Sequence, residues 1–294
     1  MQLSAKNKQT KYYPPYLKPL LIFVGGLFLL LITWLTMYLL GFRYMKIEYA
    51  NGDEALFVGR VDGDGAPIFG KATFSGGEEI TFKDGILYRA NGEFYEGELL
   101  DLKYHGKGKL TLSSGDTYMG TFEYGEIVGT GIYTFASGDI FSGDMTDGKK
   151  NGYGIYRWAD GSVYEGEFKN DLQHGKGKMT WADGSSYDGE YFKSMKHGKG
   201  KYTYADGASY EGDFYRDLRH GEGTYIWADG AYYIGDFYCD IREGKGRYVW
   251  ANGDMYEGDF HENTATGYGI FLWSSGRYSY EGYFDKGEVV VPIE

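Results

Sequence analysis

Residues 164–186 read YEGEFKNDLQHGKGKMTWADGSS, and this stretch decides the fold because the chain repeats its pattern every 23 residues. Each repeat opens on an aromatic residue that is followed two positions later by Gly. The leading aromatics are Tyr95, Tyr118, Phe141, Tyr164, Tyr187, Tyr210, Tyr233 and Tyr256, and Tyr280 follows one residue late. A fixed period of this length indicates a repeat architecture. Residues that recur in every unit are therefore expected to build the unit.

Further residues recur at fixed distances from the leading aromatic, which we count as position 0. Gly-x-Gly occupies positions 11 and 13, another Gly position 20, and aromatics mostly positions 4 and 17. In the unit that begins at Tyr187 these residues are Gly198, Gly200, Gly207, Tyr191 and Tyr204.

These positions resemble the MORN (membrane occupation and recognition nexus) family, whose repeat is Tyr-x-Gly-x-Phe with Gly-x-Gly about a dozen residues from its start. The match of residues 164–177 is close, and eight consecutive units keep one register within residues 95–294. Upstream the match decays. Phe57-Val58-Gly59 with Gly70 looks like a degenerate unit, and residues 80–94 look like a shortened one.

The spacing within a unit predicts a β-hairpin. Positions 0, 2 and 4 share one face of a strand with positions 11 to 17 of the next, because strand side chains alternate. That face collects aromatics and glycines, whose missing side chains leave room for a ring, whereas charges such as Glu165 and Lys176 collect on the other. The Ala159-Asp160-Gly161 stretch supplies a tight turn. Hairpins must stack to bury such a face, so we expect an all-β, elongated single-sheet solenoid of stacked antiparallel β-hairpins, preceded by one transmembrane α-helix.

The helix is expected at Leu20–Phe42, a stretch without any charge that is long enough to span a bilayer. A cleaved signal peptide is the main alternative, but the bulky Phe42-Arg43-Tyr44 sequence after the stretch favours a retained anchor. The flanking basic residues are four before the stretch and two after it: Lys6, Lys8, Lys11, Lys18, Arg43 and Lys46. This bias predicts a cytoplasmic N-terminus and an extracytoplasmic repeat domain in a single-pass membrane protein, and the opposite orientation stays open.

The expected domains are therefore a basic N-terminal tail (1–19), the transmembrane helix (20–42), a juxtamembrane segment with degenerate repeats (43–94), and regular repeats with a C-terminal cap (95–294). Residues 47–294 hold 24 basic and 42 acidic residues, a net charge of −18. Such a charge repels nucleic acid and anionic lipid at long range, so neither is expected as a partner.

Catalytic and metal-binding roles find little support. Four histidines, His105, His174, His197 and His220, all lie at position 10. Equivalent residues of adjacent hairpins lie roughly 9–10 Å apart, which is too far for shared zinc ligation without bending. The acids at positions 1 and 3 are expected to form cross-strand ion pairs, and Cys239 is the only cysteine. We therefore predict no catalytic residue, metal or cofactor.

The resemblance implies a protein-binding platform, and in a bacterial envelope the partner would be a cell-wall synthesis or division protein. We expect the aromatic groove to bind this partner. Its candidate residues are Tyr164, Trp158, Tyr187, Trp181, Tyr210, Tyr204, Tyr233, Trp227, Tyr256 and Trp250. The alternatives are a cell-wall glycan-binding domain, whose Tyr and Trp rings would stack on sugars, and a tether close to membrane lipid.

Overall fold

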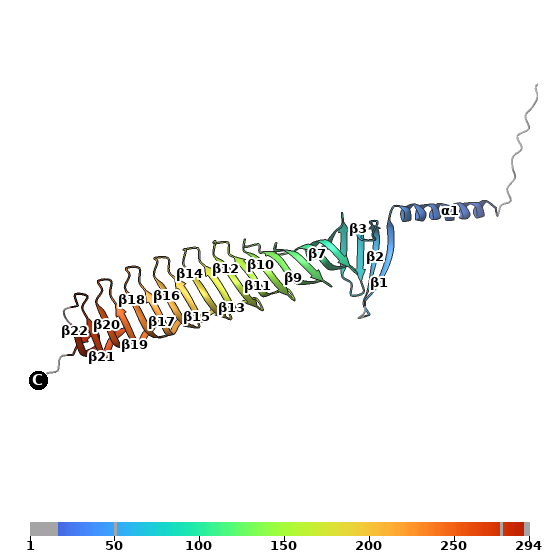
Figure 1. The fold of residues 1–294 in the computed structure, drawn as a ribbon. Coiled ribbons are helices and arrows are strands. Elements are labelled where there is room, and N and C mark those ends of the chain that lie inside the picture. Colours follow the sequence, from blue (N-terminus) through green and yellow to red (C-terminus); the bar gives the residue numbers. More distant parts are fainter. Residues whose placement is uncertain (1–16, 50–51, 277–278, 291–294) are drawn as a thin grey trace, which may run out of the picture. The chain divides into compact units, whose positions relative to one another are not determined.

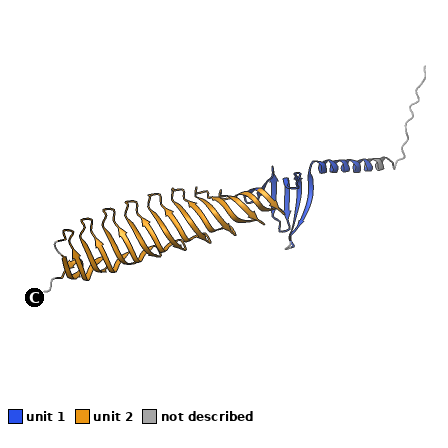
Figure 2. Cartoon of the chain, in the orientation of Figure 1, with its two compact units in different colours: residues 1–96 blue, residues 97–294 orange. Residues whose placement is uncertain are grey.

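The computed structural model describes residues 17–49, 52–276 and 279–290 of the chain (Figure 1). Residues 1–16 of the predicted basic tail lie outside this part. The chain divides into two compact units, residues 1–96 and 97–294, which are described separately (Figure 2). Among the described residues, 23 strands belong to one open antiparallel sheet. The predicted all-β sheet of antiparallel hairpins is confirmed.

The described part of the first unit contains one helix and short hairpin strands. Its elements are α1 (Leu17–Leu39), β1 (Phe42–Glu48), β2 (Glu54–Val61), β3 (Pro67–Phe74), β4 (Glu79–Lys83) and β5 (Ile86–Arg89), and β6 (Phe94–Leu100) crosses the boundary between the units. Gly59 pairs with Gly70 across β2 and β3, and Phe57 is fully buried. The degenerate repeat predicted here is thus a hairpin of the same kind.

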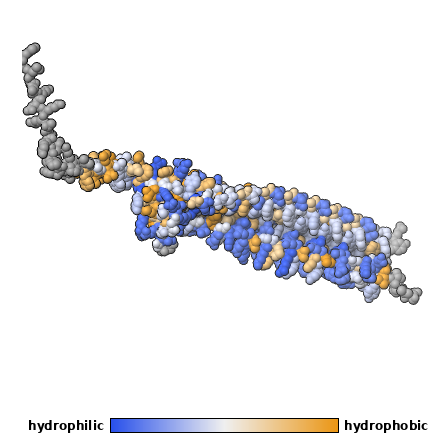
Figure 3. Space-filling model, turned by 180° about the vertical axis from the view of Figure 1, so that it is seen from behind, coloured by the Kyte–Doolittle hydropathy of each residue, from blue (hydrophilic) through white to orange (hydrophobic). Residues whose placement is uncertain are grey.

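Helix α1 presents apolar side chains outward along the part whose side chains are described, residues 23–39, and hydrophobic residues gather there in Figure 3. Gly41, with φ +83°, lies just after the helix end, and Arg43 Nη1 donates to the Tyr38 carbonyl at 2.8 Å. A basic group at this end satisfies a free helix carbonyl. The expected transmembrane helix is not confirmed, because no helix in the described part of the chain combines the length and apolarity that a bilayer crossing requires.

The second unit consists of regular hairpins. Its strands are β7 (Lys103–Thr111), β8 (Thr117–Glu123), β9 (Glu126–Thr134), β10 (Ile140–Thr146), β11 (Lys149–Arg157), β12 (Val163–Lys169), β13 (Leu172–Thr180), β14 (Ser186–Phe192), β15 (Met195–Thr203), β16 (Ser209–Tyr215), β17 (Leu218–Ile226), β18 (Tyr232–Tyr238), β19 (Ile241–Val249), β20 (Met255–His261), β21 (Thr264–Leu272), β22 (Ser279–Asp285) and β23 (Glu288–Val289). The apolar sequence Val289-Val290-Val291 predicts a final strand; β23 includes Val289, and Val291 lies outside the described residues.

Two kinds of turn alternate along this unit. The predicted turn at Gly161 is confirmed: its φ is +93° and its N–H donates to the Trp158 carbonyl at 3.0 Å. The other turn uses two residues that both have positive φ, such as Asn170 (49°) and Asp171 (69°). Such a two-residue turn matches the twist of paired strands. The hairpins from β8–β9 to β20–β21 also carry a bulge at or just after the position-2 glycine, for example between Gly189 and Glu190.

The glycines make room for the leading tyrosines, as predicted. Gly189 and Gly200 pair across β14 and β15, and the Tyr187 ring lies over both. A Cβ added at Gly200 would come within 2.4 Å of the Tyr187 hydroxyl, which is closer than real atoms approach. The paired glycines therefore let a large ring lie flat against the backbone.

Candidate functional site

The leading tyrosines form the core of the repeats. Five of the predicted groove residues belong to this set and expose at most 1% of their surface: Tyr164, Tyr187, Tyr210, Tyr233 and Tyr256. The Tyr187 ring packs edge-on against Tyr191 (5.2 Å between centroids) and against Phe214 of the next unit (5.0 Å). Its hydroxyl donates to the Glu190 carbonyl at 3.0 Å. These five residues stabilise the stack and offer no ring surface to a partner, which corrects their assignment to the groove.

The other predicted groove residues lie at the rim of the sheet. Trp158, Trp181, Tyr204 and Trp227 are half-buried, and Trp250 is 39% exposed. Each follows the last residue of its strand, as Trp181 follows β13, and opens the turn to the next strand. Their rings therefore lie beside the core and remain in contact with solvent.

Most of these rim residues, which lie at position 17, form a continuous row with the aromatic residues at position 15. We call this row the aromatic ladder. Its members are Trp181, Tyr202, Tyr204, Tyr225, Trp227, Tyr248, Trp250, Phe271 and Trp273. Neighbouring ring centroids lie 4.5–5.8 Å apart. Trp158 belongs to a separate, shorter row with Tyr156, because position 15 of the intervening unit is Met179. The ladder is the largest continuous set of partly exposed rings described in the repeats.

A row of basic side chains at position 9 lies over these rings. Arg219 lies 5.1 Å from the Tyr225 ring centre, and Lys196 lies 5.1 Å from that of Tyr202. Lys150 and Arg242 occupy the same place in their units. This row was not predicted from the sequence. Position 9 is odd-numbered like positions 11 to 17, so alternation along the strand could have placed it on the same face. Its cations are attracted to the ring faces and so help to hold the rings in place.

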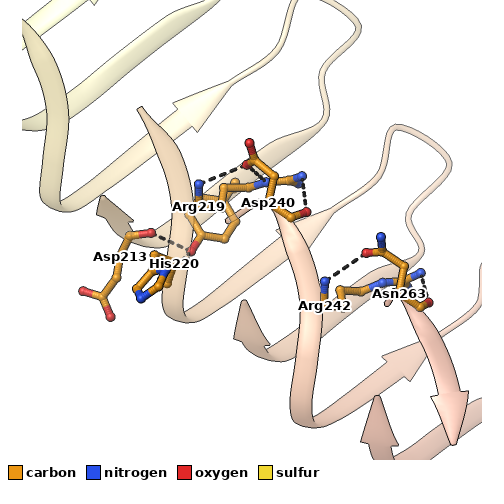
Figure 4. Close-up of polar contacts among 7 residues, drawn as sticks. Asp213, Arg219, His220, Asp240, Arg242 and Asn263 are labelled. Carbon is orange, nitrogen blue, oxygen red and sulfur yellow. Dashed lines mark hydrogen bonds and ion pairs between the residues drawn. The ribbon is translucent and has the colours of Figure 1, made fainter. Parts of the chain in front are cut away.

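Most of these cations are neutralised by an acid of the next hairpin. Arg219 Nε donates to Asp240 Oδ1 at 2.8 Å, and the backbone N–H of Arg219 donates to the same oxygen at 3.0 Å (Figure 4). Lys150 pairs with Asp171 at 3.3 Å. Burial lowers the pKa of the Lys196 ammonium, and Asp217, 3.9 Å away, counters that effect. The acid therefore holds a half-buried cation in place above the rings.

The opposite face carries the ion pairs expected from the sequence. Lys199 pairs with Asp213 at 2.8 Å, and Lys201 pairs with Glu211 at 3.4 Å, both between neighbouring hairpins. The position-3 acid has a further role, because Glu167 Oε1 accepts the N–H of Lys176 at 3.1 Å beside the bulge. These carboxylates therefore accept hydrogen bonds from the backbone and form ion pairs on the surface.

The position-10 histidines are half-buried and pack against exposed rings that lie outside the ladder. His197 lies between Phe192 and Tyr215, at 5.8 and 5.4 Å between centroids. No group of three potential metal ligands is found in the described part of the chain. Cys239 is a free thiol in a tight turn, with φ +48°.

Comparison with known proteins places these features in a family. The MORN repeat model matches eight consecutive segments, residues 95–117, 118–140, 141–163, 164–186, 187–209, 210–232, 233–255 and 256–276. No curated protein matches the chain. MORN repeat proteins are generally non-catalytic repeat or binding proteins, and no enzyme family is indicated.

Two solved structures show a remote similarity. One is the TCP domain of SAS-4 (dCPAP) of Drosophila melanogaster in complex with a proline-rich motif of Ana2 (dSTIL), at 13% identity and TM-score 0.34, covering 66% of this chain and 90% of that chain. The other is a streptogramin B lyase, at 11% identity and TM-score 0.15, covering 84% of each chain. Both scores are too low to carry a structural argument. The repeat matches cover residues 95–276, and the chain therefore belongs to the MORN repeat family.

Proposed function

We propose that this chain is a non-catalytic, membrane-anchored scaffold that binds a protein partner along its aromatic ladder. The observation that carries the proposal is the continuity of the ladder from Trp181 to Trp273. Large aromatic side chains are enriched among the residues that dominate protein interfaces. Rings that are half-exposed and already fixed by their neighbours lose little conformational freedom when a partner covers them.

The ring environment favours a protein partner over a glycan. A sugar stacks on an open ring face, but the Tyr202 face is covered by Lys196, and the Tyr225 face is covered by Arg219. Adjacent ladder rings are also tilted toward each other, for example by 51° between Trp227 and Tyr248. A polypeptide can instead pack apolar side chains against ring edges and form hydrogen bonds with the intervening polar groups.

The anchor is a separate part of the proposal and rests on α1. Phe23, Leu31 and Leu39 expose 66%, 61% and 75% of their surface, which is costly in water. The hydroxyl of Thr36 donates to the Ile32 carbonyl at 2.7 Å, so this polar group is satisfied within the helix. A helix whose surface is apolar and whose hydroxyl groups are hydrogen-bonded to its own backbone suits a lipid environment. The flanking basic residues favour an extracytoplasmic repeat domain, so the partner would be a membrane or envelope protein.

The ladder is tested by photo-crosslinking in cells. Benzoylphenylalanine replaces Trp250 on the ladder, and a matched variant carries it at the exposed Ile234 on the opposite face. We expect the Trp250 variant to capture a protein that mass spectrometry identifies, and the Ile234 variant to capture much less of it. Capture from Ile234 alone would place the partner on the charged face, and capture of glycan alone would replace the proposal with the glycan alternative.

Deletion of residues 187–209, one matched repeat, tests whether binding is distributed along the ladder. The deletion keeps the strand register and shortens the ladder by ~10 Å, so we expect a folded protein with weakened capture. Changing His174, His197 or His220 to Ala should leave capture intact. If one histidine change abolished function while the deletion was tolerated, the scaffold proposal would be wrong.

The anchor and its orientation are tested by cysteine labelling. Cys239 is first replaced by Ser, because its native thiol would react, and a single cysteine is introduced at Glu294. A membrane-impermeant maleimide should label intact cells once any outer barrier is opened. Labelling only after the inner membrane is lysed would reverse the orientation, and recovery of the full-length chain without membrane would refute the anchor.

A further inference from the structure

The repeat pattern breaks at two positions near the end of the ladder, and both breaks fall beside Arg242. In the preceding unit, Arg219 is paired with Asp240, the second residue of the next tight turn. The same place opposite Arg242 is taken by Asn263 (Figure 4). Asp171 and Asp217 occupy this place opposite Lys150 and Lys196, so the amide is the exception among the basic units.

Asn263 holds Arg242 without neutralising it. Its side-chain oxygen accepts the backbone N–H of Arg242 at 2.9 Å, and its carbonyl accepts Arg242 Nη2 at 2.7 Å. Among the described residues, no carboxylate forms an ion pair with Arg242, and Nε and Nη1 have no hydrogen-bond acceptor. Burial lowers the pKa of this guanidinium, and the nearby Arg219 lowers it further. Arginine nonetheless stays charged in proteins, so a half-buried positive charge remains without a counter-charge.

The second break creates space next to this charge. Position 9 of the following unit is Ala265, where the preceding two units carry the long side chains of Arg219 and Arg242. A cavity of about 470 Å³ occupies this place. Arg242 lines it together with the ladder rings Trp227, Tyr248, Trp250 and Phe271. No acidic residue is among the described residues that line it.

We propose that this cavity is the specificity site of the ladder and that it binds an acidic side chain, Asp or Glu, of the partner polypeptide. This inference rests on the proposed binding of a protein to the ladder. The partner's carboxylate takes the place that Asp240 has beside Arg219, and a neighbouring apolar side chain fills the space above Ala265. The free N–H groups of a guanidinium match a carboxylate in geometry and charge.

The chemistry of the site favours a carboxylate over a phosphate group. A phosphate group carries more negative charge and is usually held by several cations, but Arg219, the cation whose charge acts on Arg242, is already paired with Asp240. The walls are aromatic, which suits an amino-acid side chain with an apolar neighbour. The net charge of −18 on residues 47–294 also disfavours a dense anion, whereas a single carboxylate directed at Arg242 gains a local partner.

The test neutralises the charge of Arg242 with an acid from the chain itself and leaves the arginine in place. Asn263→Asp restores the acid found opposite Arg219, and Asp171, Asp217 and Asp240 already adopt the same backbone conformation (φ 69–70°), so the variant should fold. The matched control is Asn170→Asp, which adds the same charge in a distant tight turn, at a place where other units carry Asp101 or Asp147 with the same backbone conformation (φ 49–50°). Short random peptides displayed on phage are selected on the full-length chain, and the selected peptides are synthesised for fluorescence anisotropy.

We expect the selected peptides to share one acidic residue. Asn263→Asp should weaken their binding roughly 10- to 100-fold, and changing the peptide's Glu to Gln should weaken it similarly. Asn170→Asp should bind like the native chain. Peptides that bind native chain and Asn263→Asp equally, with no shared acid, would overturn this inference and leave the ladder proposal intact.

Two other outcomes overturn the inference for different reasons. If no peptide is selected and crosslinking from Trp250 also captures no protein, the proposed function itself fails. If Asn263→Asp changes self-association, measured by light scattering, and leaves peptide binding unchanged, the occupant is a second copy of this chain.

Discussion

Replacement of Gly200 by Ala tests the packing of the repeats most directly. Gly200 has no positive φ, so the substitution adds a methyl group without straining the backbone. The new Cβ would lie 2.4 Å from the Tyr187 hydroxyl and 2.5 Å from two ring carbons. Ordinary contacts between such atoms are about 3.5–4.0 Å, so the ring must move by about 1 Å.

The size of the loss follows from what the moved ring gives up. Tyr187 makes edge-on contacts with Tyr191 and Phe214, each worth about 0.5–1.5 kcal/mol beyond burial. Its hydrogen bond to the Glu190 carbonyl is worth about 1 kcal/mol. Partial loss of these contacts agrees with the ~1–3 kcal/mol typical of overpacked cores. We therefore expect Gly200→Ala to lower the free energy of unfolding by ~2 kcal/mol, and Gly200→Val to lower it more.

The assay must resolve a single unit, because repeat proteins need not unfold in one step. Amide hydrogen exchange followed by mass spectrometry reports the opening free energy of β14 to β16 separately from that of distant hairpins. The control is Glu211→Ala, which removes an exposed ion pair with Lys201 on the other face. This pair is expected to contribute about 0.2–1 kcal/mol.

A double-mutant cycle identifies the cause. If the methyl group clashes with the ring, Gly200→Ala should cost about 0.5 kcal/mol or less when Tyr187 is already Ala. A full loss in the Tyr187→Ala background would show that the glycine is needed for another reason. Equal losses for Gly200→Ala and Glu211→Ala in the native background would refute the assignment of the two faces.

Three further outcomes are expected. Glu167→Ala should destabilise the hairpin by about 1 kcal/mol, because it removes the acceptor of the Lys176 N–H, whereas Glu167→Gln keeps an acceptor and should be tolerated in urea unfolding. Cys239→Asn should raise the melting temperature, with a gain of up to about 1 kcal/mol, since Asn tolerates the φ of +48° better than Cys does; no change would mean that the turn is not strained. Burial raises the pKa of Tyr256 and of Tyr156 to about 12, so their contribution to stability is fully present below pH ~10, the pKa of an unfolded tyrosine, and is lost as the pH rises toward 12. Tyrosinate absorbance should accordingly rise in two phases, the second coinciding with unfolding, and a single phase near pH 10 would contradict the burial.

The pairing of the strands could be predicted from the sequence because the same residues carry both the period and the packing. An aromatic ring at the place of Tyr187 and glycines at the places of Gly189 and Gly200 recur in every regular unit, and a ring over paired glycines needs all three. The alternation of side chains then assigned the faces correctly. Since one register error would bury charges, few other pairings were compatible with the pattern.

The depth of each ring could not be predicted in this way. Alternation places Tyr187 and Tyr204 on the same face, but only the structure shows that Tyr187 is buried in mid-strand and that Tyr204 lies after the last residue of β15. The hydrogen bond of the Tyr187 hydroxyl to a carbonyl beside the bulge explains why Tyr usually leads the unit. The bulge between Gly189 and Glu190 is followed by a two-residue turn, and the turn residues with positive φ, Lys193 and Ser194, give little sign of this geometry in the sequence.

The residues that build the repeat are recognised because they recur in every unit. The residues proposed to select a partner are recognised because they depart from the repeat pattern. A residue type present in every unit, such as the leading aromatic, is explained by the packing of the repeats, and the periodic pattern makes it easy to recognise. Asn263 and Ala265 are departures from the pattern, and either alone looks like a tolerated substitution. Their joint effect appears only when the turn of one hairpin is known to meet position 9 of the preceding one, as the Arg219–Asp240 pair shows. Because one departure removes a counter-charge and the other removes a side chain at the same place, they leave a charge and a space together beside Arg242, which a structural consensus alone would not produce.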